Sequence, residues 1–389
     1  MIKYGLKASY IPEFYRERRQ KNFSVANFVA IKLSHDLHLF REASMKAAIL
    51  TAPHELAFKE AADPVAGSGD LILRVRAATI CGTDIRIFRG RKTAGVRYPS
   101  IIGHEFSGEV VEAGQGSAFA IGQRVGVCPA IPCGHCAQCL RGRENLCPHL
   151  QAIGYEIDGA FAEYIRVPAR AVALGNAHVL PQSISHEEAA LIEPLSCVLN
   201  GQNKVGLVQG DTVVILGSGP IGTLHIKLAR LRGAGRVIVS EPNAARRLAA
   251  LEAGADTVID PSAGDLQASV LAETRGLGAD VVICAIGIPA LATQAVGLAC
   301  LGGRVSLFAG FNKGDLGSMD INAIHYNELK LVGAFGLSRC NYVDAMHMIA
   351  DRRIEVASMV THRFGLAQVT DAFAMAESGA AMKVAIVDA

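Results

Sequence analysis

The stretch "TVVILGSGPIGTLHIKLARLRGAGRVIVSEP", residues 212–242, carries the clearest structural signal in the chain. A continuous apolar strand leads into a glycine-rich turn, a segment with helical period follows, and a second apolar strand ends in an acid. This is the order of one strand–helix–strand unit. Strand and helix patterns go on alternating after it, so we predict an α/β domain with a doubly wound parallel sheet over residues 196–334.

The turn "GSGPIG" places three glycines directly after the first strand, and Glu241 closes the second strand 24 residues after Gly217. Glycines at this spacing let the backbone approach a pyrophosphate at the positive end of the helix, while the acid accepts hydrogen bonds from a ribose. A tight turn without a cofactor is the alternative, and the flanking strand, helix and acid count against it. The predicted cofactor residues of this turn are Gly217, Gly219, Pro220, Ile221 and Gly222.

The segment "CGHCAQCLRGRENLC", residues 133–147, sets four cysteines on one loop at spacings of two, two and seven intervening residues. Four thiolates form a closed tetrahedral cage that suits a structural Zn²⁺ and leaves no position for a substrate. An iron–sulfur cluster is the alternative, because Pro148 follows the last cysteine, but the gap of seven and the lack of a second cysteine set argue against it. The predicted ligands are Cys133, Cys136, Cys139 and Cys147.

A second set of metal-binding residue types is dispersed: Cys81 in "CGTD", His104 and Glu105 in "GHE", and Glu193 in "EPLSCVLNG". A thiolate, an imidazole and a carboxylate can hold zinc through three protein ligands and leave a fourth position for water or substrate. Each residue also has a purely structural reading, as a small buried thiol, a buried hydrogen bond or an acid before Pro194. Spacing alone leaves both readings open.

Composition narrows the class of protein. Residues 45–195 are short β-branched runs broken by Gly and Pro, which predicts a mainly β domain that starts near Met45. A net charge of +2 and an aromatic content of 6% do not provide the basic surface and the stacking side chains that nucleic-acid binding usually requires. The apolar run "VANFVAI" is too short to span a membrane and lacks a signal-peptide cleavage site. Ten cysteines without a secretory signal indicate metal binding in the cytoplasm rather than disulfides.

Residues 1–44 differ from the rest in charge, with eight Lys/Arg against four Asp/Glu. An organelle transit peptide normally avoids acids, so this composition argues against one. Our interpretation is an N-terminal extension ahead of the folded domains, and a docking arm is the alternative.

Together these motifs resemble those of the zinc-dependent medium-chain dehydrogenases, most closely their sorbitol and threonine dehydrogenase branch. The matches are "CGTD", "GHE", the four-cysteine loop, "EPLSCVLNG", "GSGPIG" with Glu241, and "VTHRF" near the end, all in the family's order. The resemblance implies a GroES-like, β-rich catalytic domain over residues 45–195 and a Rossmann NAD-binding domain over residues 196–334. It further implies a return to the catalytic domain over residues 335–389, and a homodimer or homotetramer.

The resemblance also assigns roles to the dispersed residues. Cys81, His104 and Glu105 would hold a catalytic zinc. Close to it, Glu193 would approach the metal or its bound water, and Thr83 would take the alcohol proton. Zinc would act as a Lewis acid on the oxygen of a small-molecule alcohol or ketone, and hydride would pass between the substrate carbon and the nicotinamide.

We predict NAD rather than NADP, because the Glu241 carboxylate would repel a 2′-phosphate and accept hydrogen bonds from a free ribose diol. The counter-argument is a pair of arginines nearby, Arg246 and Arg247. Arg246 resembles the family arginine that packs against adenine, and we interpret Arg247 as part of a solvated helix face.

Two departures from the branch bear on the substrate. Many relatives carry a relay histidine two residues past Asp84, where this chain has Arg86, and sorbitol dehydrogenases place an arginine where this chain offers Gly336. Plain sorbitol is therefore less expected than another polyol, a sugar acid or phosphate, or a threonine-like amino alcohol. Two alternatives are a zinc-free quinone or enoyl reductase, which would lack "GHE" and the cysteine loop, and a non-catalytic relative, which would lack the zinc ligands.

Overall fold

The computed structural model describes residues 44–387, so the predicted N-terminal extension lies, apart from Ser44, outside the described residues. The first part of the described chain consists of short strands joined by shorter helices. The strands are β1 Ser44–Ala52, β2 Glu55–Ala62, β3 Leu71–Thr79, β4 Ser100–Ile101, β5 Glu105–Ala113, β6 Arg124–Val127, β7 Ala130–Ile131, β8 Gln151–Ala152, β9 Tyr164–Val167 and β10 Ala177–Val179. The helices are α2 Gly82–Phe88, α3 Ala137–Leu140, the short η2 Glu144–Leu146, α4 Ala169–Ala173 and α5 His186–Ala190.

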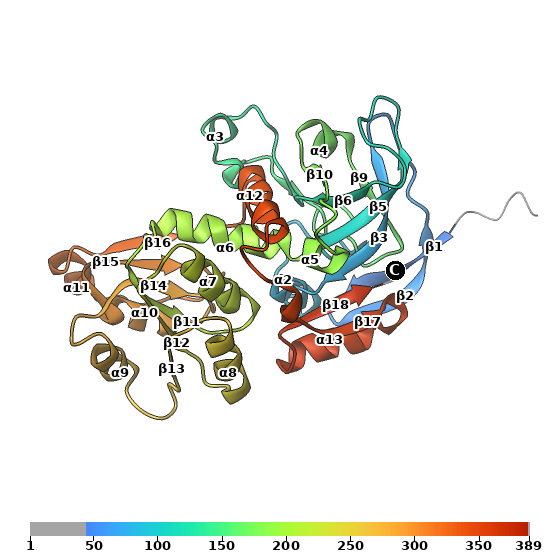
Figure 1. The fold of residues 1–389 in the computed structure, drawn as a ribbon. Helices are drawn as coiled ribbons and strands as arrows, with labels where there is room; N and C mark the ends of the chain where they lie inside the picture. The colour runs from blue at the N-terminus through green and yellow to red at the C-terminus, as the bar shows by residue number, and fades with distance from the viewer. Residues whose placement is uncertain (1–43, 388–389) are drawn as a thin grey trace, which may run out of the picture. The chain divides into compact units, whose positions relative to one another are not determined.

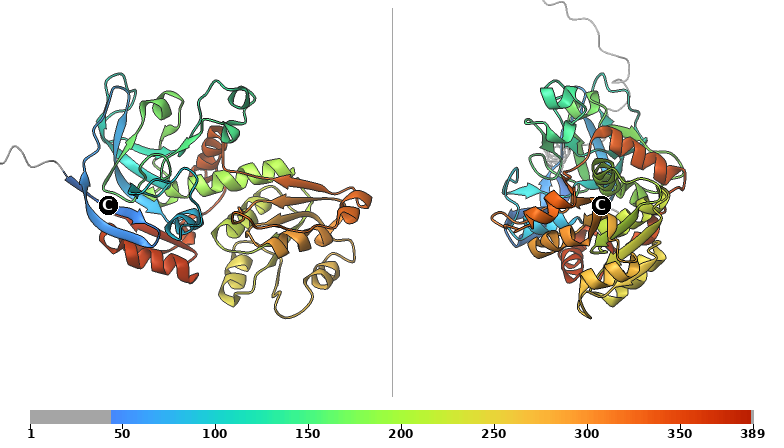
Figure 2. Two further views of the ribbon diagram at one scale, coloured as in Figure 1. Left: turned by 180° about the vertical axis from the view of Figure 1, so that it is seen from behind. Right: turned by 90° about the vertical axis from the view of Figure 1, so that its left-hand side faces the viewer.

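Strands from the early and the late parts of the described chain share one sheet, whereas β1 and β2 pair in a separate sheet with β4. The order of the shared sheet is β10-β6-β5-β3-β18-β17, and β9 also pairs with β3. Strands β17 (Val360–Gly365) and β18 (Lys383–Val387) are the last of the chain, and Ala385 lies opposite Thr79 of β3 in antiparallel register. Figure 2 shows the red helix α13 (Val369–Ser378), which links these two strands, beside the blue N-terminal strands. The C-terminal strands therefore belong to the β-rich part.

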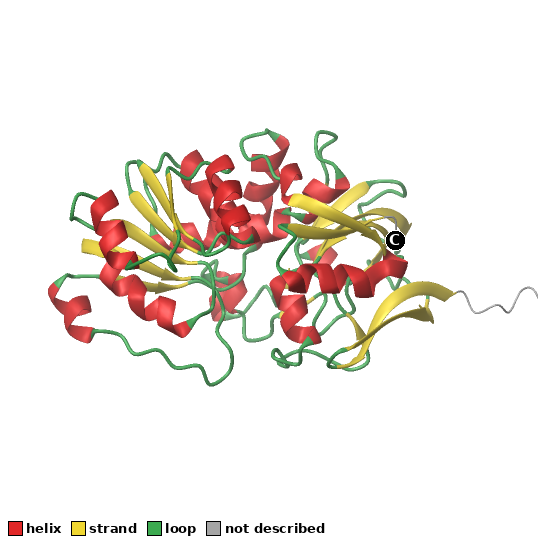
Figure 3. Cartoon of the chain, turned by 90° about the horizontal axis from the view of Figure 1, so that it is seen from below, coloured by secondary structure: helices red, strands yellow, loops and turns green. Residues whose placement is uncertain are grey.

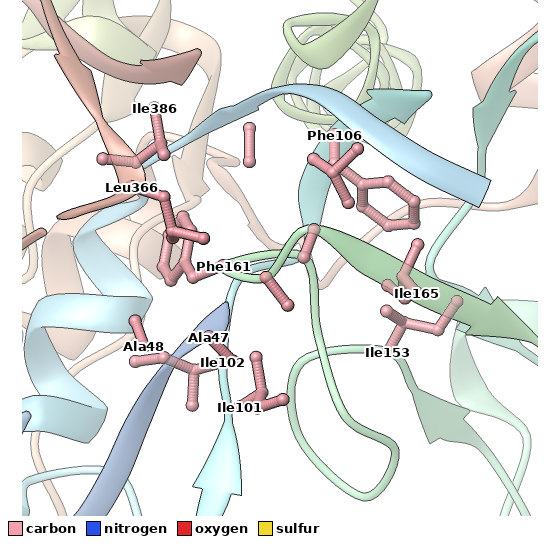
Figure 4. Packing of buried hydrophobic residues seen from close by; sticks show 14 of the residues in the cluster. Ala47, Ala48, Ile101, Ile102, Phe106, Ile153, Phe161, Ile165, Leu366 and Ile386 are labelled. Atoms are coloured by element: carbon pink, nitrogen blue, oxygen red, sulfur yellow. The ribbon is translucent and has the colours of Figure 1, made fainter. Parts of the chain in front are cut away.

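The hydrophobic core of this part is assembled from the same distant segments. Phe161 and Phe373, both buried, meet edge to face with ring centres 5.7 Å apart. Figure 4 shows Ala47 and Ile102 from early segments together with Leu366 and Ile386 from late ones. Because burial of one large apolar side chain contributes about 1.5–3 kcal/mol, the last strands are a substantial part of the stability of this core.

The second sheet has the strand order β13-β12-β11-β14-β15-β16, with every pairing parallel. Its elements are β11 Thr212–Leu216, α7 Pro220–Leu231, β12 Arg236–Ser240, α8 Ala244–Glu252, β13 Thr257–Ile259, α9 Leu266–Glu273, β14 Ala279–Cys284, α10 Pro289–Leu298, β15 Ala299–Leu307, α11 Ile321–Tyr326 and β16 Lys330–Gly333. Numbered within the sheet, this is the order 3-2-1-4-5-6 of the dinucleotide-binding fold. Figure 3 shows helices on both sides of its strands. The predicted doubly wound parallel sheet is confirmed.

Two helices connect the β-rich part with the parallel sheet. Helix α6 (Ile192–Val205) and helix α12 (Arg339–Ala350) lie against each other in the ribbon of Figure 1. Buried side chains from both, such as Leu195 and Tyr342, belong to one hydrophobic cluster. The boundary predicted between residues 195 and 196 falls inside α6, so the exact domain limits stay predictions. Two short helical turns, η3 Ala357–Met359 and η4 Leu366–Gln368, complete the described elements. Within residues 44–387, no helix combines the length and the hydropathy that crossing a bilayer requires.

Candidate functional site

Cys81 lies where the chain leaves β3 and begins α2. The Asp84 carboxylate accepts a hydrogen bond from the Cys81 backbone N–H (2.8 Å), which is one half of a capping box and fixes the start of the helix. The other Asp84 oxygen lies 3.1 Å from Nδ1 of His104, and Asp84 is completely buried. A carboxylate behind an imidazole sets the ring orientation and tautomer of a metal ligand. Asp84, whose role was not predicted, therefore orients both Cys81 and His104.

The dispersed ligand set converges in the structure. The ligand atoms of Cys81, His104 and Glu105 lie within 4.8 Å of one another. One Glu105 oxygen accepts hydrogen bonds from the Thr79 hydroxyl and from the Lys383 ammonium (2.5 Å to Nζ), whereas the other, Oε1, is buried without a partner among the described residues. An unsatisfied buried acceptor costs about 1–3 kcal/mol, more when charged, and a cation beside it removes that cost. The three residues fit a zinc ion.

Glu193 and Thr83 lie outside that group of three. Glu193 stands in the first turn of α6, and its Oε1 accepts a hydrogen bond from the Cys197 thiol (3.5 Å). Burial raises the pKa of Glu193 to about 7, and the Glu105 carboxylate acts in the same direction. Thr83 lies two residues after Cys81, partly buried in the first turn of α2. Glu193 is therefore close enough to Glu105 for their charges to interact, but it is not one of the three grouped ligand residues.

Two further charges shape this site. Burial alone would lower the pKa of Lys383, but the Glu105 carboxylate and the Cys81 thiol raise it, so the buried ammonium stays charged. Burial likewise opposes protonation of His104, but Tyr155, Asp84 and Cys81 outweigh it and raise its pKa. Lys383 was not predicted from the sequence. The available signal was a lysine at the start of the apolar strand "KVAIVDA".

The four-cysteine loop has the geometry of a metal cage. The Sγ–Sγ distances are 3.9 Å for Cys133–Cys139, 3.5 Å for Cys136–Cys139 and 3.8 Å for Cys136–Cys147. A tetrahedral zinc with Zn–S bonds of about 2.3 Å separates its sulfurs by about 3.8 Å. Hydrogen bonding from the His135 backbone, followed by that of Cys136, lowers the pKa of Cys133 to about 6, although desolvation opposes it. These thiols fit the predicted structural zinc.

The cysteine loop is fixed to the segment that precedes α12. Glu144 forms a two-point ion pair with Arg339 (3.1 Å from Nε to Oε1). The Asn145 amide donates to the Phe335 carbonyl oxygen (2.7 Å), and the Asn200 amide of α6 donates to the Gly336 carbonyl oxygen (2.9 Å). The cysteine loop therefore helps to hold the segment after β16 in place.

Replacing Cys136 by serine should reduce the zinc content from two ions per chain to one and lower the unfolding temperature. The loop would lose its cross-link, and a metal-bound loop depends on its ion for folding. The chemical step should change less than stability, since no cysteine of the loop belongs to the group around His104. Metal analysis and thermal unfolding measure both effects. Two tightly bound zinc ions in the variant would reject a structural role for the loop.

The dinucleotide turn joins β11 to α7. Gly217 has a left-handed φ of 91°, and a Cβ on Gly222 would lie 2.0 Å from the Gly217 carbonyl oxygen, so both positions require glycine. A Cβ on Gly219 would meet only Arg246 at 3.8 Å, so packing does not demand a glycine there. No side chain caps α7, whose N-cap is Gly219 and whose first residue is Pro220. The open space and the uncapped helix end suit a pyrophosphate.

Glu241 lies at the end of β12 and is buried. Its two oxygens accept hydrogen bonds from the backbone N–H groups of Ser218 (2.9 Å) and Asn243 (3.0 Å). Arg247 donates to the Glu241 carbonyl oxygen (2.9 Å) and pairs with Asp260 (3.0 Å), so it is a structural cation rather than the solvated one predicted. Arg246 donates to the Gly379 carbonyl oxygen (2.8 Å), while its Nε has no partner among the described residues.

Comparison with known proteins places this geometry in a family. The GroES-like domain of alcohol dehydrogenases matches residues 67–177, and the zinc-binding dehydrogenase domain matches residues 220–351. The sorbitol dehydrogenase of Halalkalibacterium halodurans is 33% identical over 346 residues, which cover 87% of this chain and 98% of the relative. The chain belongs to the zinc-dependent medium-chain dehydrogenases. The expected GroES-like and Rossmann folds are thereby confirmed.

Other members of this dehydrogenase family are similarly related. L-galactonate-5-dehydrogenase of Escherichia coli is 32% identical over 333 residues, covering 85% of this chain and 95% of the relative. A solved structure from Sinorhizobium meliloti, described as a zinc-binding dehydrogenase bound to NADP, is 36% identical with a TM-score of 0.83 and covers 89% of this chain and 100% of that one. This chain is accordingly an oxidoreductase that acts on CH–OH groups with a nicotinamide dinucleotide.

Proposed function

We propose that this dehydrogenase oxidises a secondary alcohol of a polyol, sugar derivative or threonine-like substrate to a ketone with NAD, at a catalytic zinc held by Cys81, His104 and Glu105. The observation that carries the assignment is the Glu105 carboxylate, whose ligand atom lies within 4.8 Å of those of Cys81 and His104. One of its oxygens contacts Thr79 and Lys383, and the other is buried without a hydrogen-bond partner among the described residues. The four-cysteine loop would hold a second, structural zinc.

The residues of the chain have separate tasks in this reaction. Zinc would supply Lewis-acid chemistry that favours an ionised alcohol oxygen near neutral pH. Asp84 keeps His104 oriented, Thr83 takes the alcohol proton, and Glu193, with a pKa near 7, is able to accept or release one. The turn at Gly217–Gly222 would hold the dinucleotide, and its nicotinamide would supply the hydride acceptor. Arg86 stands where many relatives carry the relay histidine, and a guanidinium group has only donors and no acceptor for a proton, so the proton relay would end closer to Thr83.

The proposed function is tested by NAD reduction with polyols, sugar acids, sugar phosphates and L-threonine. We expect turnover with at least one of these classes and its loss after zinc removal, restored by added zinc. Activity that survives complete metal depletion would favour the zinc-free reductase alternative. Turnover with none of the classes would remove the substrate assignment.

The choice of NAD over NADP rests on Glu241. Arg247 is committed to Asp260 and to two backbone carbonyl oxygens, so it is not free for a 2′-phosphate, whereas Glu241 lies beside the turn. Hydrogen bonds to a charged group contribute about 1.5–3 kcal/mol, so NAD should be preferred by roughly 10- to 150-fold in kcat/KM. The Sinorhizobium relative is described as bound to NADP, and in this chain Arg246, near Glu241 in the sequence, is the arginine that competes with this preference.

Glu241→Ser should erode this preference, because it removes the acceptor for the ribose diol and the charge that repels the phosphate. The measurement is kcat/KM with each cofactor, with Glu252→Ser, an exposed acid at the end of α8, as the matched control. Equal or better use of NADP by the parent would overturn the NAD assignment. An unchanged ratio in Glu241→Ser would show that another residue selects the cofactor.

We also propose a cytoplasmic homo-oligomer. None of the ten cysteines is in a disulfide, in keeping with a reducing compartment. Strand β16 is an edge of the parallel sheet, and the apolar side chains of Leu301, Ile321 and Tyr326 are exposed on the segments before it. Sedimentation velocity of the purified chain measures the assembly state directly.

A further inference from the structure

A lysine beside the ligand set has no task in the reaction described above. Lys92 lies in the loop after α2, and its side chain is only partly exposed. Its Nζ lies 4.2 Å from the centre of the Tyr155 ring, and that centre lies 5.2 Å from the centre of the His104 ring. A cation over an aromatic face is held by the ring quadrupole. Tyr155 therefore contacts both the ammonium group and a zinc-ligand candidate.

Lys92 lacks a charged partner. Within residues 44–387 its ammonium forms no ion pair, and its one side-chain hydrogen bond goes to the Ala94 carbonyl oxygen (2.5 Å). An ammonium group has three donors, so two remain for a ligand. Burial lowers the pKa of Lys92, an effect that Glu156 opposes and Arg86 reinforces. A partly desolvated cation in this state is stabilised by an anionic ligand.

The neighbouring charged side chains have partners of their own. Glu156 accepts a hydrogen bond from the Ala152 backbone N–H (2.8 Å) and has no ion pair with Lys92. Arg86 donates to the carbonyl oxygens of Gly310 (3.4 Å) and Phe311 (2.9 Å), which ties α2 to the loop after β15, and only its buried Nε has no partner among the described residues. Lys92, with two donors of a partly exposed ammonium group left, has more capacity to bind an anion than Arg86.

We propose that Lys92 is a specificity residue that binds a carboxylate or phosphate on the carbon chain of the substrate while the reacting hydroxyl group lies at Cys81, His104 and Glu105. This inference rests on the proposed function and narrows its substrate class. Tyr155 positions the ammonium at a fixed distance from His104. A sugar acid or sugar phosphate then binds better than a neutral polyol, and a threonine-like zwitterion is disfavoured because its own ammonium lies next to its carboxylate.

The test compares kcat/KM with NAD for a neutral hexitol, a hexonate and a hexitol phosphate of the same configuration. The parent should prefer at least one anionic substrate over the hexitol by about 10- to 100-fold. Lys92→Met keeps the apolar stem over Tyr155. It should lose the preference for anionic substrates through a higher KM for them, while its kcat/KM for the hexitol stays close to that of the parent. Lys92→Arg should retain part of this preference. Lys59→Met, at an exposed lysine on β2, is the matched control and should change nothing.

A second readout does not depend on turnover. Inorganic phosphate is titrated calorimetrically at saturating NAD, so that the pyrophosphate site is filled. Its Kd should rise about 10-fold in Lys92→Met but not in Lys59→Met. The larger preference, for hexonate or for phosphate ester, identifies the anionic group.

Three outcomes overturn the inference: a parent that uses the hexitol at least as well as both anions, a Lys92→Met variant that keeps the anion preference, or unchanged phosphate binding in that variant. The proposed function survives any of these as long as one substrate is oxidised. The proposed function fails separately if none of the three substrates is oxidised. The phosphate titration then still decides the role of Lys92.

Discussion

Cys81→Ala is expected to reduce kcat/KM for alcohol oxidation by about 10³-fold or more, while dinucleotide binding and the fold stay intact. Lewis-acid stabilisation is worth several kcal/mol of barrier, and each 1.36 kcal/mol corresponds to tenfold in rate. Cys81 supplies the sulfur of the proposed three-residue set. It lies at a helix start where the Asp84 carboxylate accepts from its backbone N–H, and the alanine variant keeps that hydrogen bond. The parallel sheet, where the cofactor would bind, is built from other strands, so the substitution leaves it unchanged.

The readouts for Cys81→Ala are NAD reduction, zinc content, and cofactor affinity by fluorescence. Cys340→Ala is the matched control, because that cysteine is exposed and belongs to neither cysteine set. Its activity and zinc content should equal those of the parent. Full activity in a metal-depleted Cys81→Ala protein would sink the catalytic-zinc assignment.

Lys383→Met should cost about 3–5 kcal/mol of stability, because it removes one member of a buried charge pair and leaves the other unpaired. Lys383 and Glu105 are 4% and 1% exposed, and after the substitution only the Thr79 hydroxyl would face that carboxylate oxygen. The unfolding temperature should fall by several degrees, and further after zinc removal, since the proposed zinc would be the second cation near Glu105. The pKa of Lys383 is raised, so its contribution is complete at neutral pH and is lost only as pH rises through that raised pKa.

The control for Lys383→Met is Lys46→Met. Lys46 pairs with Glu60 at 2.8 Å, but the two side chains are 43% and 64% exposed, and such pairs are worth about 0–1 kcal/mol. Thermal unfolding of both variants, with and without a chelator, gives the comparison. Equal unfolding temperatures for the two variants would contradict the buried-pair account.

The parts of this fold that could be predicted from the sequence are those whose signals are local. The glycine turn, the acid at the end of the next strand and the cysteine spacings each lie within a few dozen residues. Strand period and spacing are enough to predict the parallel sheet and the metal cage. The family motifs added roles for Cys81, His104 and Glu105, and the structure places their ligand atoms together.

The supporting residues could not be predicted, because they depend on strand register between distant segments. Thr79 lies opposite Glu105 on one side and opposite Ala385 on the other. Residues two apart on a strand share a face, so this register carries Lys383 toward Glu105. No periodicity within the last strand reveals that pairing. Lys92 was missed for a similar reason, since its contact with Tyr155 joins two loops.

The place of β18 between β3 and β17 has a consequence for how the enzyme is made. Domains tend to fold as units while the chain emerges from the ribosome. All strands of the parallel sheet are complete by residue 333, whereas the buried charge partner of Glu105 arrives at residue 383. A nascent chain can therefore complete the strands of its parallel sheet early, but the catalytic pocket lacks its buried lysine until residue 383 has been made. Premature termination anywhere in the last helix would yield a cofactor-binding but inactive protein.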